Sequence, residues 1–386
     1  MEAVIVEAKR TPFGKYGGIL KHLEPEELLK PLYNYLKDNH NEAIECLEEV
    51  VLGNVIGNGG NIARKSLLEA KLSQHIPGVT IDRQCGSGLE AVTYACRMVQ
   101  ANAGEVYIAG GVESTSRAPW RIKRPQSIYE TEPPQFYERA SFAPEGSDPS
   151  MIEAAENVAQ VYNVSRKSQD EYAYSSHQKT LQAIKQGHLL QEILPLKVKN
   201  ETVDKDESIK PRLKLKTLSR LKPFIQNGTV SVGNSCMKND GAVLLLIMSK
   251  EKAISLGYKE GLEFVNSAVS GVNPNLLGIG PVPAVEKLLK REHLSIKDID
   301  VVEFNEAFSS QVLASKELLN IPDIKFNIYG GALAIGHPYG ASGAQLVTRL
   351  YHMKQMEYSI ATMGIGGGMG HATLFKRWKR EDRSFV

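Results

Sequence analysis

The stretch DRQCGSGLEAVTYACRMVQ, residues 82–100, decides the fold. Apolar, β-rich segments flank it, GVTI at 78–81 and VYIAGGVES at 106–114, and both are typical of buried strands. Within the stretch, apolar side chains recur at helical spacing on one face: Leu89, Val92, Cys96 and Val99. The order strand, tight turn, helix, strand predicts an α/β fold with Cys85 at the turn.

A second unit of the same kind lies near the C-terminus. Residues 330–355 predict a glycine-rich loop followed by a helix, and SIATMGIGGGMG at 359–370 predicts a strand that ends in glycines. The spacing between the turn and the following glycines is nearly equal in the two units, which indicates an internal duplication. Proline-rich and charged stretches separate the units, at 115–150 and 195–228, and we expect them to be surface loops over one end of the sheet.

Composition limits the class of partner. The chain has 386 residues, 42% of them hydrophobic, and a formal net charge of +2, as expected for an enzyme with a large core. This near balance gives no general attraction for nucleic acid, so a small-molecule partner is favoured. The longest apolar run, AVLLLIM at 242–248, is too short to cross a membrane, and the first residues do not form a signal-peptide core.

Cysteine usage points to a reducing compartment. The four cysteines show no CxxC pair and no disulfide-rich density: Cys46, Cys85, Cys96 and Cys236. We therefore expect a cytoplasmic protein with neither a membrane nor a nucleic-acid partner. No P-loop, HExxH, EF-hand or zinc spacing is present, so no metal or redox cofactor is expected.

Two side chains are candidates for nucleophile and base. Gly86 and Gly88 permit a sharp turn at Cys85, and a thiol at a helix N-terminus is expected to ionise near neutral pH. The alternative is a buried structural cysteine. His337 lies among glycines in GGALAIGHPYGASG and could take the proton of Cys85. Its alternative is an ordinary, hydrogen-bonded polar residue.

Two further segments could support this pair. Asn305 follows an apolar strand in DIDVVEFNEAFSSQ and could orient a water molecule or His337, although an asparagine at this point could also be a helix N-cap. The glycine run GIGGGMG at 364–370 could offer backbone N–H groups to an oxyanion or a phosphate. A dinucleotide site is excluded, because too few residues follow the run to complete a βαβ unit.

Taken in order, these segments and several others resemble the thiolase family over essentially the whole chain. The matching segments are RTPFGKYGG at 10–18, GGNIAR at 59–64, CGSGLEAV at 85–92, GGVESTSRAP at 110–119, AAENVA at 154–159, LKPF at 221–224, NDGA at 239–242, GIGPVPA at 278–284, NEAF at 305–308, GGALAIGHPYGASG at 330–343 and GGGMG at 366–370. So many ordered matches are highly specific. A ketoacyl-carrier-protein synthase is a related alternative, but GHPYGASG and GGGMG are more similar to thiolases.

The resemblance implies a thiolase fold, with two similar halves in a five-layer α/β/α/β/α arrangement and an inserted loop region. The expected N-terminal half comprises residues 1–115, 150–195 and 229–255. The loop excursions over the active site comprise 116–149 and 196–228. The C-terminal half comprises 256–386. The family also implies a homodimer or homotetramer.

The resemblance also implies the role of each site residue. Cys85 would hold the acyl group as a thioester and His337 would activate it. Backbone N–H groups of Cys85 and Gly366 would bind one oxyanion, and His337 with a water molecule on Asn305 would bind the other. Substrate contacts are expected from three side chains: Met151, Cys236 and Leu277. Acyl-CoA and CoA would be substrates, with CoA phosphates met by lysines or arginines within 205–222.

One position departs from the family pattern in a way that affects the chemistry. The family has a second cysteine before the glycine run, as CIGGG, whereas this chain has Gly364. That cysteine exchanges the proton at the substrate α-carbon, and losing an acid or base typically costs about 10²- to 10⁴-fold in rate. Cys236, His371 or a water molecule could substitute for it.

The expected function is therefore an acyl-CoA acyltransferase of thiolase type, in lipid metabolism. The alternative is a cysteine-dependent acyl-CoA transferase or thioesterase that stops at the thioester because of Gly364. A non-catalytic CoA-binding subunit is disfavoured, since a scaffold needs no thiol, base and oxyanion site together.

Overall fold

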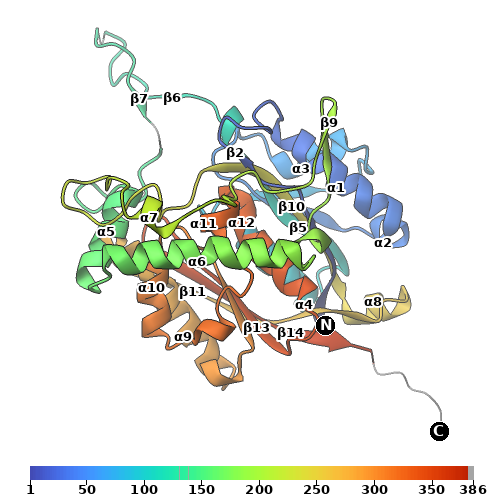
Figure 1. Cartoon of the computed structure of the whole chain (residues 1–386). Helices are drawn as coiled ribbons and strands as arrows, with labels where there is room; N and C mark the ends of the chain where they lie inside the picture. The colour runs from blue at the N-terminus through green and yellow to red at the C-terminus, as the bar shows by residue number, and fades with distance from the viewer. Residues whose placement is uncertain (130, 138, 381–386) are drawn as a thin grey trace.

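The computed structural model describes residues 1–129, 131–137 and 139–380 (Figure 1). The strands are β1 (Ala3–Arg10), β2 (Gly14–Lys15), β3 (Glu49–Gly53), β4 (Gly78–Ile81), β5 (Val106–Ser114), β6 (Arg121–Ile122), β7 (Phe136–Tyr137), β8 (Leu196–Val198), β9 (Glu201–Val203), β10 (Asn239–Ser249), β11 (Glu260–Gly271), β12 (Val301–Phe304), β13 (Tyr358–Ile365) and β14 (Met369–Lys379). The α-helices are α1 (Pro25–Asn39), α2 (Asn41–Glu45), α3 (Ile62–Glu69), α4 (Ser87–Gln100), α5 (Met151–Val161), α6 (Arg166–Lys185), α7 (Leu215–Leu218), α8 (Lys250–Ser255), α9 (Pro281–Arg291), α10 (Ser309–Leu318), α11 (Ala332–Ile335) and α12 (Tyr339–His352). Short 3₁₀ turns are η1 (Thr115–Arg117), η2 (Leu189–Gln191), η3 (Pro274–Ile279), η4 (Ile296–Asp298) and η5 (Asp323–Lys325).

The predicted duplication is confirmed by the strand order. The main sheet runs β12-β13-β14-β11-β1-β10-β5-β3-β4, with β2 paired to β10. In the first half, β3 is parallel to β4 and β5, and β10 and β1 follow antiparallel. The second half repeats this order, because β12 is parallel to β13 and to a bridge at Phe326, and β14 and β11 follow antiparallel. The two half-sheets join where β1 pairs with β11, from Ala3 to Ile5.

Alternation along the strands builds five layers. In β10, Val243, Leu245 and Ile247 face a central core, whereas Leu244 and Leu246 face an outer core. Residues of α4 and α12 fill the central core between the half-sheets. Helices α1 and α3 cover the outer face of the first half-sheet, and α9 and α10 cover that of the second. Figure 1 shows α12 in the interior, between the blue N-terminal helices and the orange C-terminal ones. The five-layer prediction is confirmed.

Glycines bring the starts of α4 and α12 together. A Cβ on Gly88 would lie 2.5 Å from the carbonyl oxygen of Gly340, and a Cβ on Gly343 would lie 2.4 Å from the Leu89 nitrogen. Only glycine permits so close an approach. Cys85 precedes Gly88 by three residues and His337 precedes Gly340 by three. The helix contact therefore brings these two turns to the same end of the molecule.

A long insertion distinguishes the two halves. Residues 115–238 separate β5 from β10, whereas the equivalent strands β13 and β14 are joined by Gly366–Gly368 alone. Helices α5 and α6 of the insertion pack on α10, η3 and α11. Strands β6 and β7 form an arm that projects from the body (Figure 1). None of the helices in the described part of the chain is long and apolar enough to span a bilayer.

Candidate active site

The turn before α4 presents the Cys85 side chain. Gln84 adopts a left-handed backbone conformation with φ of 49°, which marks a sharp turn. The Ser87 hydroxyl donates to the Gln84 carbonyl at 2.6 Å and accepts from the Arg83 N–H at 2.8 Å. Helix α4 begins at Ser87, so Cys85 lies two residues before its first turn, as the sequence predicted.

The Cys85 sulfur is surrounded by protein, although the residue keeps some surface exposure. Burial raises the pKa of the thiol to about 12, and hydrogen bonding by the backbone N–H groups of Cys85 and Gly366 opposes this rise. The nearby Glu113 carboxylate raises the pKa further. The prediction of a thiolate near neutral pH is therefore wrong for the free protein, because the loss of hydration outweighs the helix terminus.

His337 is held as a neutral base. Its Nδ1 lies 2.5 Å from the Ser342 hydroxyl, and that hydroxyl donates its only proton to the Pro338 carbonyl at 3.0 Å. Nδ1 must therefore be the protonated nitrogen, which leaves the lone pair on Nε2. Burial lowers the pKa of His337 to about 4. Nε2 is buried and has no hydrogen-bond partner among the described residues.

Asn305 lies directly after β12, where its backbone N–H donates to the Thr362 carbonyl at 3.1 Å. The helix-cap alternative is wrong, because α10 begins at Ser309 and its N-cap is Phe308. The Asn305 side chain is 2% exposed, and its Nδ2 finds no acceptor in the described part of the chain. A buried, unpartnered amide N–H is a common sign of a water or ligand site.

Glu306, next to Asn305, fixes the loop before His337. Its carboxylate accepts hydrogen bonds from the Tyr172 hydroxyl at 2.7 Å, the Ser176 hydroxyl at 2.7 Å and the Leu333 N–H at 3.2 Å. Glu113 does the same for the start of α12, since it accepts from the Gly340 N–H at 2.9 Å. Its pKa is raised to about 7 by burial.

The three predicted substrate residues differ in how they are placed relative to the rest of the site. The backbone N–H of Cys236 donates to the Ala307 carbonyl at 2.9 Å, and burial together with the Cys85 charge raises the pKa of its thiol. Leu277 is buried, and its carbonyl oxygen would lie 3.4 Å from a Cβ on Gly364. Met151 is half-buried at the start of α5, a helix that packs on η3, which carries Leu277.

The space beside Gly364 is occupied. A Cβ on Gly364 would lie 2.6 Å from Nε2 of Gln311, which comes from α10. Sequence reasoning missed Gln311, and it also missed Ser342, although a serine five residues after His337 in a helix start was a usable signal. Phe142 was missed too: its ring would be 2.8 Å from a Cβ on Gly366, so the 116–149 excursion covers this glycine.

His371, a candidate substitute for the missing thiol, is engaged elsewhere. It is fully buried in β14, and its Nε2 lies 3.4 Å from the hydroxyls of Thr93 and Thr373. Its Nδ1 lies 3.5 Å from the Glu90 carboxylate. Burial lowers the pKa of His371 to about 3. The ring packs against α4, whereas Gly364 faces Gln311 in α10, so His371 does not stand in for the thiol.

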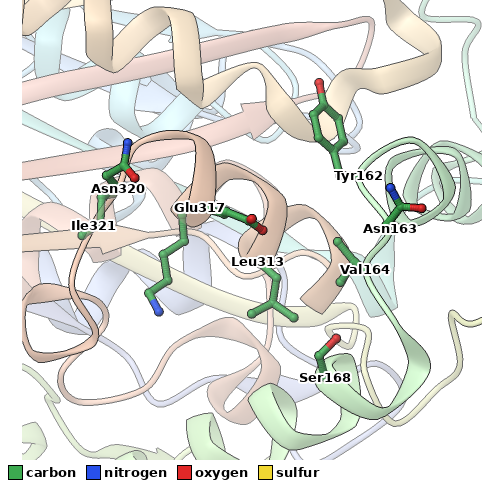
Figure 2. A pocket seen from close by; sticks show the side chains of 9 residues that line it. Tyr162, Asn163, Val164, Ser168, Leu313, Glu317, Asn320 and Ile321 are labelled. Carbon is green, nitrogen blue, oxygen red and sulfur yellow. The ribbon is translucent and has the colours of Figure 1, made fainter.

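A surface pocket of about 390 Å³ lies between the end of α5 and α10 (Figure 2). Tyr162, Val164, Leu313 and Asn320 are among its lining side chains. None of the predicted site residues lines it. Across the described residues, no group of three or more His, Cys, Asp or Glu side chains is placed to hold a metal ion.

Comparison with known proteins gives a consistent result. Two family models match, Thiolase, N-terminal domain, over residues 3–251 and Thiolase, C-terminal domain, over residues 259–377. A Staphylococcus epidermidis protein named "Putative acetyl-CoA C-acetyltransferase VraB" is 65% identical over 377 residues. The match covers 98% of this chain and 99% of that protein. A Staphylococcus aureus protein of the same name is 64% identical, covering 98% of this chain and 100% of its own.

Solved structures agree in fold. The Bacillus anthracis acetyl-CoA acetyltransferase superposes with a TM-score of 0.93 at 34% identity, over 98% of this chain and 99% of that chain. Human mitochondrial 3-ketoacyl-CoA thiolase in complex with CoA superposes with a TM-score of 0.91 at 33% identity, over 97% of this chain and 98% of that chain.

Proposed function

Because this chain belongs to the thiolase family and is an acyltransferase, we propose that it moves an acetyl or other acyl group between coenzyme A thioesters through a thioester on Cys85. The proposal is supported by the position of Cys85, at the turn before α4, and by the backbone N–H groups of Cys85 and Gly366, which favour a charged sulfur. Such donors stabilise negative charge that develops beside the sulfur during acyl transfer.

In the first step, the Cys85 sulfur attacks the thioester carbon of acyl-CoA. At neutral pH both partners start uncharged, since the thiol has a raised pKa and the imidazole a lowered one. His337 Nε2 takes the thiol proton as the sulfur attacks, and then gives it to the departing CoA sulfur. The bond from sulfur to CoA breaks, and the acyl group remains on Cys85.

The supporting residues have distinct roles in this proposal. The N–H groups of Cys85 and Gly366 bind the oxygen of the acyl group on Cys85, each worth about 3 kcal/mol in the transition state. His337 and a water molecule on Asn305 face the other oxyanion. Ser342 holds the imidazole in the tautomer that the proton transfer needs.

A second candidate function is a cysteine-dependent acyl-CoA transferase or thioesterase without efficient carbon-carbon chemistry. Gly364 favours it, because a glycine offers no acid or base where the resemblance expects a thiol. The nearest side chain there, Gln311, exchanges no proton at neutral pH. Cys236 lies close enough to Cys85 for their charges to interact, but its raised pKa keeps it a neutral thiol.

The proposal also covers the substrates, the cellular location and the oligomeric state. Acyl-CoA and CoA are the substrates, with no resident metal or redox cofactor, and the setting is lipid metabolism in the cytoplasm. A homodimer or homotetramer is supported by exposed apolar side chains on and beside the β6–β7 arm: Trp120, Ile122, Ile128, Tyr129 and Phe136.

Intact-mass spectrometry after mixing with acetyl-CoA tests the proposal. One acetyl group should appear on the wild-type protein and be mapped to Cys85, and the Cys85→Ala variant should remain unlabelled. The Cys96→Ala variant, which alters another buried cysteine, should label like wild type. Absence of label on Cys85 would overturn the proposed function. Formation of acetoacetyl-CoA, or its cleavage with CoA, separates the two candidates.

A further inference from the structure

Gln311 is a buried carboxamide at the edge of the site. Its side chain is 2% exposed and passes Gly278, where a Cβ would lie 3.0 Å from its Cγ. Its Nε2 ends beside the backbone of Gly364. Gly364 lies two residues before Gly366, whose N–H favours a charged Cys85 sulfur. The carboxamide therefore lies beside a glycine that is about 7 Å, or two strand residues, from Gly366 along the chain.

The oxygen of this carboxamide has no partner. Gln311 Oε1 is buried, and none of the described residues donates a hydrogen bond to it. Leaving such an acceptor unsatisfied typically costs about 1–3 kcal/mol, so a native structure normally provides a water molecule or a ligand. Gln311 itself forms no part of the helix-capping network, because the N-cap of α10 is Phe308.

Two other buried polar atoms also lack a hydrogen-bond partner among the described residues, Asn305 Nδ2 and His337 Nε2. A chain of backbone contacts connects their segments. The His337 N–H donates to the Met237 carbonyl at 3.0 Å, and the next residue back, Cys236, donates to the Ala307 carbonyl at 2.9 Å. Ala307 lies in the short segment between Asn305 and Gln311.

The three atoms match the hydrogen-bonding capacity of one water molecule. A water molecule donates twice and accepts at least once, so a single water molecule within reach of all three atoms would donate to Gln311 Oε1 and His337 Nε2 and accept from Asn305 Nδ2. Two to four polar partners are what an ordered buried water molecule needs. One lone pair of the water oxygen is left, and it is free to attack an electrophile.

We propose that Gln311 is a positioning residue that holds a hydrolytic water molecule against the acyl group on Cys85, which gives the protein acyl-CoA thioesterase activity. This inference rests on the proposed Cys85 thioester. The water oxygen bonds to the acyl carbon, and the bond between that carbon and the Cys85 sulfur breaks. The water proton passes to His337 Nε2 and then to the sulfur, which releases a carboxylic acid and free Cys85. Gln311 exchanges no proton.

The test separates the two half-reactions. Protein acetylated with acetyl-CoA is freed of CoA by rapid desalting, and loss of the acetyl mass from Cys85 is followed in buffer. Gln311→Met keeps the shape of the side chain and removes its acceptor. We expect it to slow hydrolysis about tenfold to hundredfold, while the rate of acetylation stays within about twofold of wild type. A role in folding alone would not separate these two rates.

Two further variants complete the test. Gln311→Glu keeps an acceptor oxygen and should restore hydrolysis, with a rate that rises with pH as the carboxylate forms and becomes a base. Gln345→Met is the matched control, since Gln345 is another buried glutamine with an unpartnered Nε2 among the described residues. Its hydrolysis rate should equal that of wild type.

The failures are distinguishable. A wild-type protein that never becomes acetylated refutes the proposed function itself. An acetyl-enzyme that forms but is stable in water refutes the hydrolytic role, and so does a Gln311→Met variant that hydrolyses at the wild-type rate. An equal slowing of hydrolysis in Gln345→Met also refutes it, because loss of any buried glutamine would then be enough.

Discussion

Restoring a thiol at position 364 is the sharpest perturbation of this site. A Cβ on residue 364 would lie 2.6 Å from Gln311 Nε2, whereas ordinary contacts begin at 3.4 Å, so the carboxamide must retreat by about 0.8 Å. The backbone of Gly364 is not in the left-handed region, so the side chain itself introduces no backbone strain. Because the contacted atom is the free end of a flexible side chain, the cost in the free energy of unfolding should be at the low end of that for overpacking, about 1 kcal/mol.

The chemical gain should depend on removing this overlap. A correctly placed acid or base contributes roughly 10²- to 10⁴-fold, so the Gly364→Cys, Gln311→Ala double variant should cleave acetoacetyl-CoA with CoA at least about a hundredfold faster than Gln311→Ala alone. Gly364→Cys alone should gain less, because Gln311 competes for the space. Gly364→Ala is the control that adds the Cβ without a thiol, and it should lose stability and gain nothing.

The assay is consumption of acetoacetyl-CoA in the presence of CoA, paired with urea unfolding of each variant. Full activity and unchanged stability in Gly364→Cys alone would show that Gln311 does not fill the space beside Gly364. No gain in the double variant would show that the missing thiol does not limit the rate.

Three other predictions follow from the buried groups of the site and the core. Ser342→Ala removes the hydrogen bond that holds the His337 ring, so it should slow Cys85 acetylation roughly tenfold to hundredfold. Ser66→Ala alters another buried serine and should leave the rate unchanged, so equal rates for the two variants would contradict the role of Ser342. In a variant that lacks the exposed Cys46 (Cys46→Ser), iodoacetamide should alkylate Cys85 at a rate that keeps rising beyond about pH 10, because burial raises the pKa of the thiol to about 12. A rate that levels off near about pH 7 would show that burial does not dominate the pKa. Burial lowers the pKa of His177 to about 4, so the folded protein loses stability as pH falls from the unfolded value of about 6.5 toward 4. The loss of unfolding free energy between about pH 7 and pH 5 should therefore be smaller in His177→Gln than in wild type, by up to about 2 kcal/mol. An equal loss in both proteins would refute this.

The sequence by itself determined the architecture and singled out Cys85 and His337 as the candidate nucleophile and base. The strand, turn, helix, strand pattern around Cys85 and its repeat after Gly330 predicted two halves, because apolar periodicity and glycine placement are local properties of a chain. The β5 strand was located at 106–114 as the structure has it, and the four apolar side chains of α4 are all fully buried. The absence of a thiol at position 364 was likewise evident without coordinates.

Only the tertiary structure decided the pKa values of the site groups and which residues lie beside one another in the site. The predicted thiolate at Cys85 was wrong because its pKa depends on how much water the surrounding layers remove, which no local pattern records. The tautomer of His337 came from two hydrogen bonds to residues of α12 and the turn before it. Gln311 is 53 residues from Gly364 along the chain, and only the folded arrangement of α10 and β13 brings its carboxamide to that glycine. Distances between such segments are set by the close packing of whole layers, so they follow from the fold as a unit and not from any single stretch of sequence.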